Sequence, residues 1–167
     1  MRTLLITDDH ASVRTTLEYV LGFHYRVLLA SSGFEAQQII KTETIDAALV
    51  DLHMPGMDGF QTCEALLTYT REQGKILPVW LMTAAFSAVA QKRALEIGAV
   101  TLLSKPFDCE ALVAALEKSF ADQPRLAKIQ RFEPENKALA VPATPHAPEA
   151  VDDSQRDMRE RRGNPAA

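Results

Sequence analysis

The chain has 167 residues, of which 47% are hydrophobic and 24% are charged, and this composition excludes a protein that is fibrous or disordered throughout. The formal net charge is -4, and residues 1–122 hold ten basic against fifteen acidic residues, so we expect no nucleic-acid partner. Apolar runs are far shorter than a membrane-spanning helix and the amino terminus lacks signal-peptide features, so we expect no membrane partner and a cytoplasmic location.

Short apolar runs and stretches with helical spacing alternate strictly along the first 122 residues. This alternation indicates a parallel sheet whose crossover helices cover both faces. The predicted fold class is therefore α/β, a flavodoxin-like (βα)5 doubly wound sheet with strand order 2-1-3-4-5. In chain order, strands are expected at 3–7, 26–30, 45–50, 77–82 and 100–103, and helices at 11–21, 34–41, 59–72, 87–97 and 109–120.

The composition changes near Asp122. Six of the nine prolines lie beyond it, among few large apolar residues, so this part buries too little surface to offset its ordering entropy. We predict one domain at 1–122 and, at 123–167, a mostly disordered tail with no output domain and a Pro-rich spacer at 141–148. The two cysteines, Cys63 and Cys109, are too isolated for a disulfide framework or zinc site and are expected to be buried free thiols.

Polar residues stand where the apolar strands end. Asp8 and Asp9 follow the first strand, Asp51 the third, Thr83 the fourth, and Lys105 comes just after the fifth. In an open α/β sheet the ligand site lies outside the carboxyl ends of the strands, and here the switch in strand order falls between strands one and three. We therefore expect the three aspartates to meet at one edge of the sheet.

Three clustered carboxylates repel one another and need either raised pKa values or a bound cation. Oxygen ligands suit Mg2+, which uses one or two carboxylates, waters and a phosphate oxygen. Lys105 and the Thr83 hydroxyl would then hold a phosphoryl group, whose transfer depends on positioning and charge stabilisation. Each residue alone also fits a structural role, such as helix capping by Asp8 and Asp9 or a turn at Asp51. Four strands placing suitable residues at one edge favour the phosphoryl site.

These residues resemble the receiver domain of two-component response regulators. The resemblance covers about residues 2–121, through the segments LITDDH (5–10), LVDLHMPGMDG (49–59), LMTA (81–84) and LSKPF (103–107). It implies that Asp51 is the phosphoacceptor, taking a phosphoryl group from a phosphohistidine of a histidine kinase or histidine phosphotransfer protein. It also implies a Mg2+ site and a cis peptide bond before Pro106.

The resemblance also assigns roles to the other residues. Asp9 would bind Mg2+ directly and Asp8 through water or weakly, with Asp51 and the backbone carbonyl of His53 completing the protein ligands. Lys105 would pair with Asp51 or the phosphoryl group, and Thr83 would move to hydrogen-bond a phosphoryl oxygen. We expect only the carbonyl of His53 to matter, with imidazole-catalysed dephosphorylation as the alternative.

One residue departs from the family pattern. Leu102 stands three residues before Lys105, where the family usually has Tyr or Phe as a switch position. Leucine is smaller and has no hydroxyl, so our hypothesis is that coupling from Thr83 to the helix at 87–97 is altered, with Phe86 taking part.

The predicted function is that of a single-domain response regulator, which catalyses only its own phosphorylation and dephosphorylation and signals or relays through contacts with an unknown downstream protein. One alternative is a phosphorylation-independent interaction module acting through the receiver face and tail, but the intact set of site residues argues against it. Another is a phosphohydrolase with Asp51 as nucleophile, which would usually want a second carboxylate where His53 stands.

Overall fold

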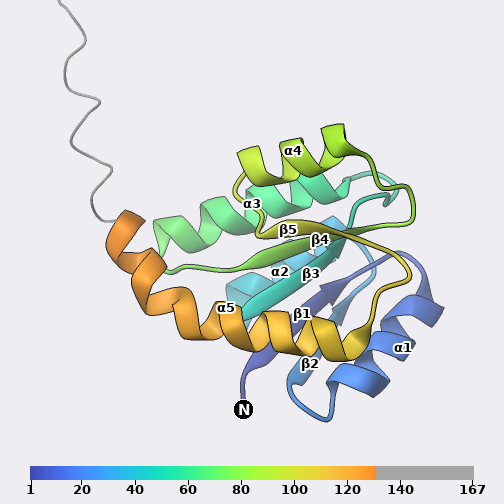
Figure 1. Ribbon diagram of the computed structural model, residues 1–167, viewed down its shortest axis with the longest axis horizontal. Coiled ribbons are helices and arrows are strands. Elements are labelled where there is room, and N and C mark those ends of the chain that lie inside the picture. The colour runs from blue at the N-terminus through green and yellow to red at the C-terminus, as the bar shows by residue number, and fades with distance from the viewer. Residues whose placement is uncertain (131–167) are drawn as a thin grey trace, which may run out of the picture. The chain divides into compact units, whose positions relative to one another are not determined.

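The structure, a computed structural model, describes residues 1–130 and their side chains as far as residue 121. Five strands alternate with five helices in this part of the chain, as the sequence predicts (Figure 1). The elements are β1 (Thr3–Thr7), α1 (Ala11–Leu21), β2 (Arg26–Ala30), α2 (Gly33–Thr42), β3 (Ala47–Asp51), α3 (Gly59–Glu72), β4 (Val79–Thr83), α4 (Ala88–Glu96), β5 (Thr101–Ser104) and α5 (Cys109–Gln130).

The strands form one parallel sheet in the order β2-β1-β3-β4-β5, which confirms the predicted topology. Every residue of β1, β3 and β4 is buried, because these central strands have neighbours on both sides and helices on both faces. In register, Thr7 lies beside Val50, and Asp51 lies beside Met82. The polar ends of β1, β3 and β4 therefore lie next to one another.

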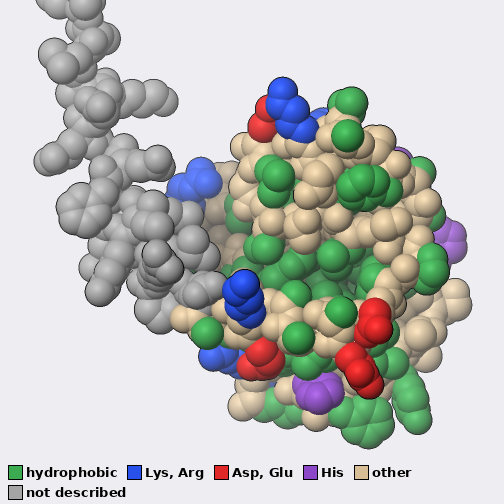
Figure 2. Space-filling view, viewed as in Figure 1, with side chains coloured by type: hydrophobic (Ala, Val, Ile, Leu, Met, Phe, Trp, Pro, Cys, Tyr) green, Lys and Arg blue, Asp and Glu red, His purple; other side chains and the backbone are tan. Residues whose placement is uncertain are grey.

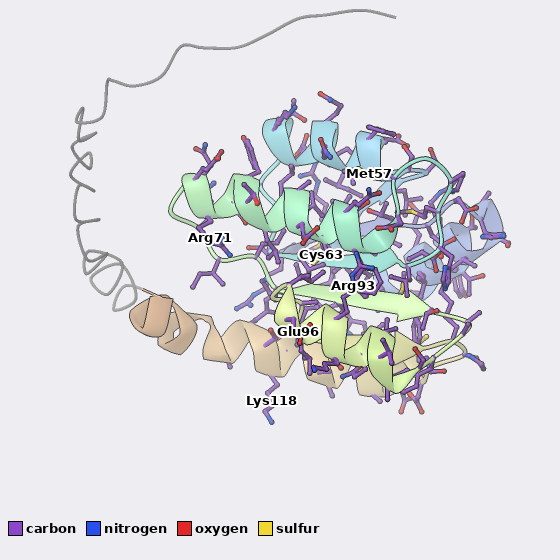
Figure 3. The ribbon with its side chains drawn as sticks, turned by 90° about the horizontal axis from the view of Figure 1, so that it is seen from above. Met57, Cys63, Arg71, Arg93, Glu96 and Lys118 are labelled. Atoms are coloured by element: carbon purple, nitrogen blue, oxygen red, sulfur yellow. The ribbon has the colours of Figure 1, made fainter. Side chains whose placement is uncertain are left out.

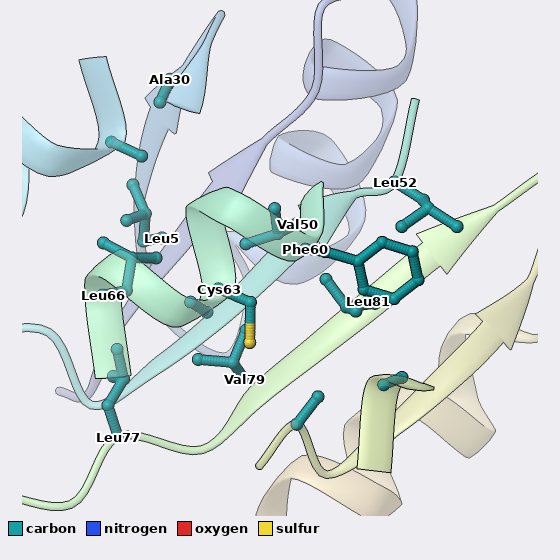
Figure 4. Packing of buried hydrophobic residues seen from close by; sticks show 14 of the residues in the cluster. Leu5, Ala30, Val50, Leu52, Phe60, Cys63, Leu66, Leu77, Val79 and Leu81 are labelled. Atoms are coloured by element: carbon teal, nitrogen blue, oxygen red, sulfur yellow. The ribbon is translucent and has the colours of Figure 1, made fainter. Parts of the chain in front are cut away.

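Two apolar clusters fill the two faces of the sheet. On one face α2, α3 and α4 pack on side chains such as Leu5, Val50 and Leu81, and Figure 4 shows α3 lying across these strands. On the other face α1 and α5 pack on Ile6 and Trp80, among others. The side chains of successive residues in each strand thus point to opposite faces of the sheet.

The chain returns very close to the sheet where α3 begins. Gly59 opens α3, and a Cβ at this position would collide with the backbone oxygen of Asp51. The Asp58 side chain accepts a hydrogen bond from the Gln61 N–H, and the Gln61 side chain accepts one from the Asp58 N–H, so a complete capping box fixes this start. Loop 52–58, which follows Asp51, is therefore held at both ends.

The last helix differs most from the prediction. The predicted end at Phe120 is wrong, because α5 continues to Gln130 with Pro124 inside it. The sequence around Pro124 is rich in Ala, Gln, Arg, Leu and Lys, which are strong helix formers, whereas the prediction rested on the prolines and the scarcity of large apolar residues beyond Asp122. Residues 123–130 are thus helical rather than disordered. The remainder of the predicted tail, including the spacer at 141–148, lies outside the described residues.

Two smaller features concern the cysteines and the apolar character of the helices. Both cysteines are free, as predicted, although only Cys63 is buried and Cys109 is half-buried. No helix within residues 1–130 combines the length and apolar character needed to cross a membrane. On the face drawn in Figure 2, Lys and Arg side chains are scattered among acidic and apolar ones rather than gathered in one patch.

Candidate functional site

The centre of the site is an ammonium group held between two buried carboxylates. Lys105 Nζ lies 2.6 Å from Asp8 Oδ2 at the end of β1 and 2.6 Å from Asp51 Oδ1 at the end of β3. Asp8 is fully buried, and only 5% of Asp51 is exposed. The parallel sheet brings these groups together although they lie 97 and 54 residues from Lys105 in sequence.

The two carboxylates stabilise the charged form of Lys105. Burial alone would lower the pKa of Lys105, but the hydrogen bonds that it donates to Asp51 and Asp8, together with their negative charges, raise the pKa above its usual value. The lysine is therefore positively charged at neutral pH. One cation faces two carboxylates, so the centre retains an excess of negative charge.

The backbone around Asp51 orients its carboxylate. Asp51 Oδ2 accepts a hydrogen bond of 2.9 Å from the N–H of His53, while Oδ1 accepts the bond from Lys105. The cis peptide bond between Lys105 and Pro106, implied by the resemblance, is present. The Lys105 N–H also donates to the Thr83 carbonyl over 2.7 Å, so β4 and the loop after β5 are tied together beside the site.

The second part of the site is the loop between β1 and α1. Asp8 Oδ1 accepts a hydrogen bond from the N–H of His10, and the Asp8 carbonyl accepts one from Arg14 Nη1. Asp9 Oδ1 is buried and accepts no hydrogen bond. His10 Nδ1 lies 2.9 Å from that oxygen and 3.5 Å from Asp8 Oδ1.

These donors fit a divalent cation. Asp8, Asp9 and His10 each offer a ligand atom, and the three atoms all lie within 4.8 Å of one another. Asp9 Oδ1 is buried and accepts no hydrogen bond, and its close partner is the His10 ring, which forms an ion pair with it when the imidazole is protonated. A bound cation would also satisfy this oxygen. Two aspartates beside a third, Asp51, supply the oxygen ligands that Mg2+ takes.

Two predicted residues lie at the margin of this centre. Thr83 is buried, and its hydroxyl accepts a hydrogen bond from the Ala85 N–H over 3.1 Å. Leu102 faces away from the centre: only 4% of it is exposed, and it packs in the apolar cluster under α2, α3 and α4. Its N–H donates to Gln91 Oε1 of α4 over 3.1 Å. The expected switch position is therefore buried in this structure.

The structure thus places Lys105 in contact with both Asp8 and Asp51, with Asp9 next to Asp8 after β1 and Thr83 at the end of β4. His53 reaches Asp51 through its backbone, and its side chain is exposed. The sequence interpretation missed His10 and Arg14. The signal for His10 was visible, because it directly follows the two aspartates, whereas the Arg14 contact depends on the turn geometry at the start of α1.

Comparisons with known proteins agree with this geometry. A family model described as the response regulator receiver domain matches residues 4–117. The chain is similar to response regulator MprA of Mycobacterium avium, with 36% identity over 145 residues, and to MprA of Mycobacterium ulcerans, with 37% identity over 114 residues. These matches cover 86% and 68% of this chain but only 58% and 47% of the relatives, so the chain spans about half the length of these proteins.

Solved structures show the same fold. The chain is similar to the Vibrio cholerae chemotaxis protein CheY4, with a TM-score of 0.65 and 28% identity, covering 71% of this chain and 98% of that one. A CheY-like receiver domain protein from Methanospirillum hungatei gives a TM-score of 0.68 at 23% identity, covering 75% and 98%. The family match extends over more than half of the chain and includes every residue of the acidic centre. The chain therefore belongs to the response regulator receiver domain family.

Proposed function

We propose that the chain is a Mg2+-dependent phosphoacceptor that takes a phosphoryl group on Asp51. The observation that carries the proposal is the placement of Asp51, nearly buried at the end of β3 and held 2.6 Å from the ammonium of Lys105. A nearly buried aspartate that is paired with a lysine ammonium and held by a backbone N–H is a nucleophile with fixed orientation. Catalysis of phosphoryl transfer needs little more than such positioning and charge stabilisation.

In the proposed reaction, a carboxylate oxygen of Asp51 attacks the phosphorus of a phosphohistidine. The new P–O bond gives an acyl phosphate, and the P–N bond breaks with its electron pair remaining on the imidazole of the donor. Lys105 then has a phosphoryl oxygen within reach, because its ammonium already contacts Asp51. The Thr83 hydroxyl is a second candidate donor, and reaching a phosphoryl oxygen would require a change from its present bond to the Ala85 N–H.

Asp8, Asp9, Asp51 and the His53 carbonyl are the proposed protein ligands of Mg2+. When bound, the ion would reduce the repulsion between the carboxylates and the incoming phosphoryl oxygens. Asp8 is kept in place for this role by the N–H of His10 and, through its carbonyl, by Arg14. The arrangement supports self-catalysed phosphorylation and dephosphorylation, and no separate substrate is proposed.

The proposed partners are a histidine kinase or histidine phosphotransfer protein as donor, and a downstream protein that binds the receiver face. Relaying or signalling through protein contacts is supported by the likeness to CheY4, of which nearly the whole chain is matched. The acidic balance of residues 1–122 gives no attraction to nucleic-acid phosphates, so a nucleic-acid partner is not proposed for this part. We also propose a cytoplasmic location, where such kinases expose their phosphohistidine.

The proposal is tested by incubating the full chain with acetyl phosphate and Mg2+ and recording its intact mass. We expect a gain of one phosphoryl group that requires Mg2+ and is lost in Asp51→Asn. Asp58→Asn is the matched control, because Asp58 lies in the same loop and asparagine still caps α3. The control should be phosphorylated like the wild type.

Two results would contradict the proposal. Labelling that persists in Asp51→Asn would place the phosphoryl group elsewhere. Absence of labelling in the folded wild type, with both acetyl phosphate and a phosphohistidine donor, would favour the phosphorylation-independent interaction module.

A further inference from the structure

A groove that the phosphorylation site does not use lies between α2 and α3, which run side by side over one face of the sheet (Figure 3). Its volume is about 370 Å3. Ile40 of α2 and two residues of α3, Ala65 and Tyr69, give it apolar walls, and of these Ile40 is buried while the other two are half-buried. The groove therefore presents apolar surface at which a ligand could exclude water.

The charges around this groove are mostly negative. Glu64 and Glu72 are exposed and lie eight residues apart on α3, a rise of about 12 Å along the helix, whereas Lys41 of α2 is the cation among the lining residues. Neither glutamate has an ion-pair partner among the described residues. The groove thus suits an apolar ligand that carries positive charge at its edges.

The end of α5 has the complementary character. The helix continues to Gln130, ten residues past Phe120, and Figure 1 shows this end projecting beyond the sheet. Residues 123–130 include Arg125 and Lys128 and no acidic residue. Leu126 and Ile129 are three residues apart, so a helix places them on one side, next to the two basic positions. Helices that bind in apolar grooves have this amphipathic pattern.

The helix and the groove of one copy cannot meet. α5 packs on the face of the sheet opposite to α2 and α3, and it is one continuous helix to Gln130, so it does not turn back toward the groove of its own domain. We propose that residues 123–130 of a second copy of the chain bind in the groove, with their apolar side on its walls and their basic residues beside Glu64 and Glu72. The inference does not depend on phosphorylation of Asp51.

This contact joins two different surfaces, so repeating it produces chains or rings of copies rather than a closed dimer. Sedimentation velocity of the full chain from about 10 µM to about 1 mM tests it, because so small an interface should have a Kd on the order of 100 µM. We expect the weight-average sedimentation coefficient to rise with protein concentration. It should fall again when NaCl is raised from about 50 mM to about 500 mM, since salt screens the charges.

Two pairs of substitutions test the two surfaces separately. Arg125→Glu with Lys128→Glu reverses the charge of the helix end, and Glu64→Lys with Glu72→Lys reverses that of the groove. Each pair should weaken self-association at least about tenfold, because like charges would then face one another. An equimolar mixture of the two variants should associate again, because one retains the original groove and the other the original helix end.

Glu18→Lys with Glu110→Lys is the matched control. Both glutamates are exposed, they lie on α1 and α5, and their replacement changes the net charge as much as the groove variant does. The control should associate like the wild type, and circular dichroism checks that every variant is folded.

Four outcomes would overturn the inference. A wild type that stays monomeric at about 1 mM has no such contact at the strength expected of a weak interface. Association that both pairs of substitutions leave unchanged would place the contact on other surfaces. Failure of the mixture to associate would show that the helix end and the groove do not bind each other, and an equal loss in the control would assign the effect to net charge.

Discussion

At the scale of single residues, Lys105 is the group on which the acidic centre depends. Lys105→Met would leave the carboxylates of Asp8 and Asp51 buried without their cation. In metal-free buffer at neutral pH we expect the free energy of unfolding to fall by about 3 kcal/mol, the usual result of removing one partner of a buried ion pair. Urea unfolding with EDTA measures this, and added Mg2+ should restore part of the loss.

Lys92→Met is the control for that experiment. The Lys92 side chain is 79% exposed and its ion pair with Glu96 spans 3.7 Å, so its removal should cost less than about 0.5 kcal/mol. Equal effects of the two substitutions would contradict the view that the buried pairs, and not lysine charge in general, hold the centre together.

The two cysteines provide a second residue-scale prediction. Cys63 is completely buried beneath α3, and burial, with a smaller effect of the Glu64 charge, raises the pKa of its thiol to about 12. Cys109 is only half-buried at the start of α5. Iodoacetamide should therefore modify Cys109 and spare Cys63 in the folded chain, because only the thiolate reacts. Peptide mapping checks this, and alkylation of Cys63 without unfolding would contradict the packing in Figure 4.

At the scale of elements, two side chains of α4, those of Gln91 and Arg93, contact the neighbouring elements β5 and α3. Gln91 Nε2 donates to Thr101 Oγ1 over 3.0 Å, and Gln91 Oε1 accepts from the Leu102 N–H, so one amide group spans α4 and the edge strand β5. On the other side Arg93 lies 4.1 Å from the ring centre of Phe60 and reaches toward α3 (Figure 3). Any movement of α4 that is coupled to Thr83 would have to break these contacts.

Gln91→Ala tests this fastening. It leaves the Leu102 N–H without its partner, which should lower the free energy of unfolding by about 1–2 kcal/mol and speed hydrogen exchange at the Leu102 amide. Val89→Ala is the control, because Val89 also lies on α4 and is 80% exposed. If the hydrogen-exchange rate of the Leu102 amide is unchanged in Gln91→Ala, then the hydrogen bond to Gln91 does not protect this amide from exchange.

The hypothesis of altered coupling at Leu102 belongs to the same element and remains a prediction. The Leu102 side chain is already buried, so it has no exposed position from which to move inward. On binding beryllofluoride, we expect chemical-shift changes to stay in the loops around Asp51. Wholesale shifts in α4 would contradict this.

Elements whose signals are local could be predicted from the sequence. The bounds of β1, β2, α1 and α3 match the structure because apolar periodicity and glycine or polar residues mark both ends. The strand order also followed, and it brought Asp8 and Asp51 together as expected. Long-range side-chain contacts such as that of Gln91 with Leu102 have no sequence signature. The continuation of α5 was missed because the prolines and the scarcity of large apolar residues beyond Asp122 were given more weight than the strong helix formers there.

At the scale of the whole molecule, α5 runs from the carboxyl ends of the strands, where the site lies, toward their amino ends (Figure 1). It follows the loop that carries Lys105 and packs on one face of the sheet. Two further contacts of α5 lie near the amino ends of β1 and β2. There Tyr25 Oη donates to Glu117 Oε1 over 2.8 Å, and Arg2 lies 4.1 Å from the ring centre of Phe120. These contacts link the middle of α5 to the residues that precede β1 and β2. They therefore hold the helix whose first residues follow the lysine loop.

This tie makes the stability of the molecule sensitive to alkaline pH. Burial, with the hydrogen bond to Glu117 and the charge of that residue, raises the pKa of Tyr25 far above its usual value of 10.0. Below pH 10 the hydroxyl is protonated in both the folded and unfolded chain, and its contribution to stability is complete. Above pH 10 only the unfolded chain loses this proton readily, so the free energy of unfolding must fall as pH rises.

Tyr25→Phe isolates the effect, because it keeps the ring against Phe120 and removes the titrating group. Near neutral pH the wild type should be more stable than the variant by about 1–2 kcal/mol, owing to the hydrogen bond to Glu117. Above pH 10 this difference should shrink and then reverse, at up to about 1.4 kcal/mol for each pH unit. Lys105, whose pKa is also raised, lowers stability in the same direction, but it is present in both proteins and cancels. Urea unfolding at a series of pH values from 8 to 11.5 measures the difference, and a difference independent of pH would mean that Tyr25 titrates alike in the folded and unfolded chain.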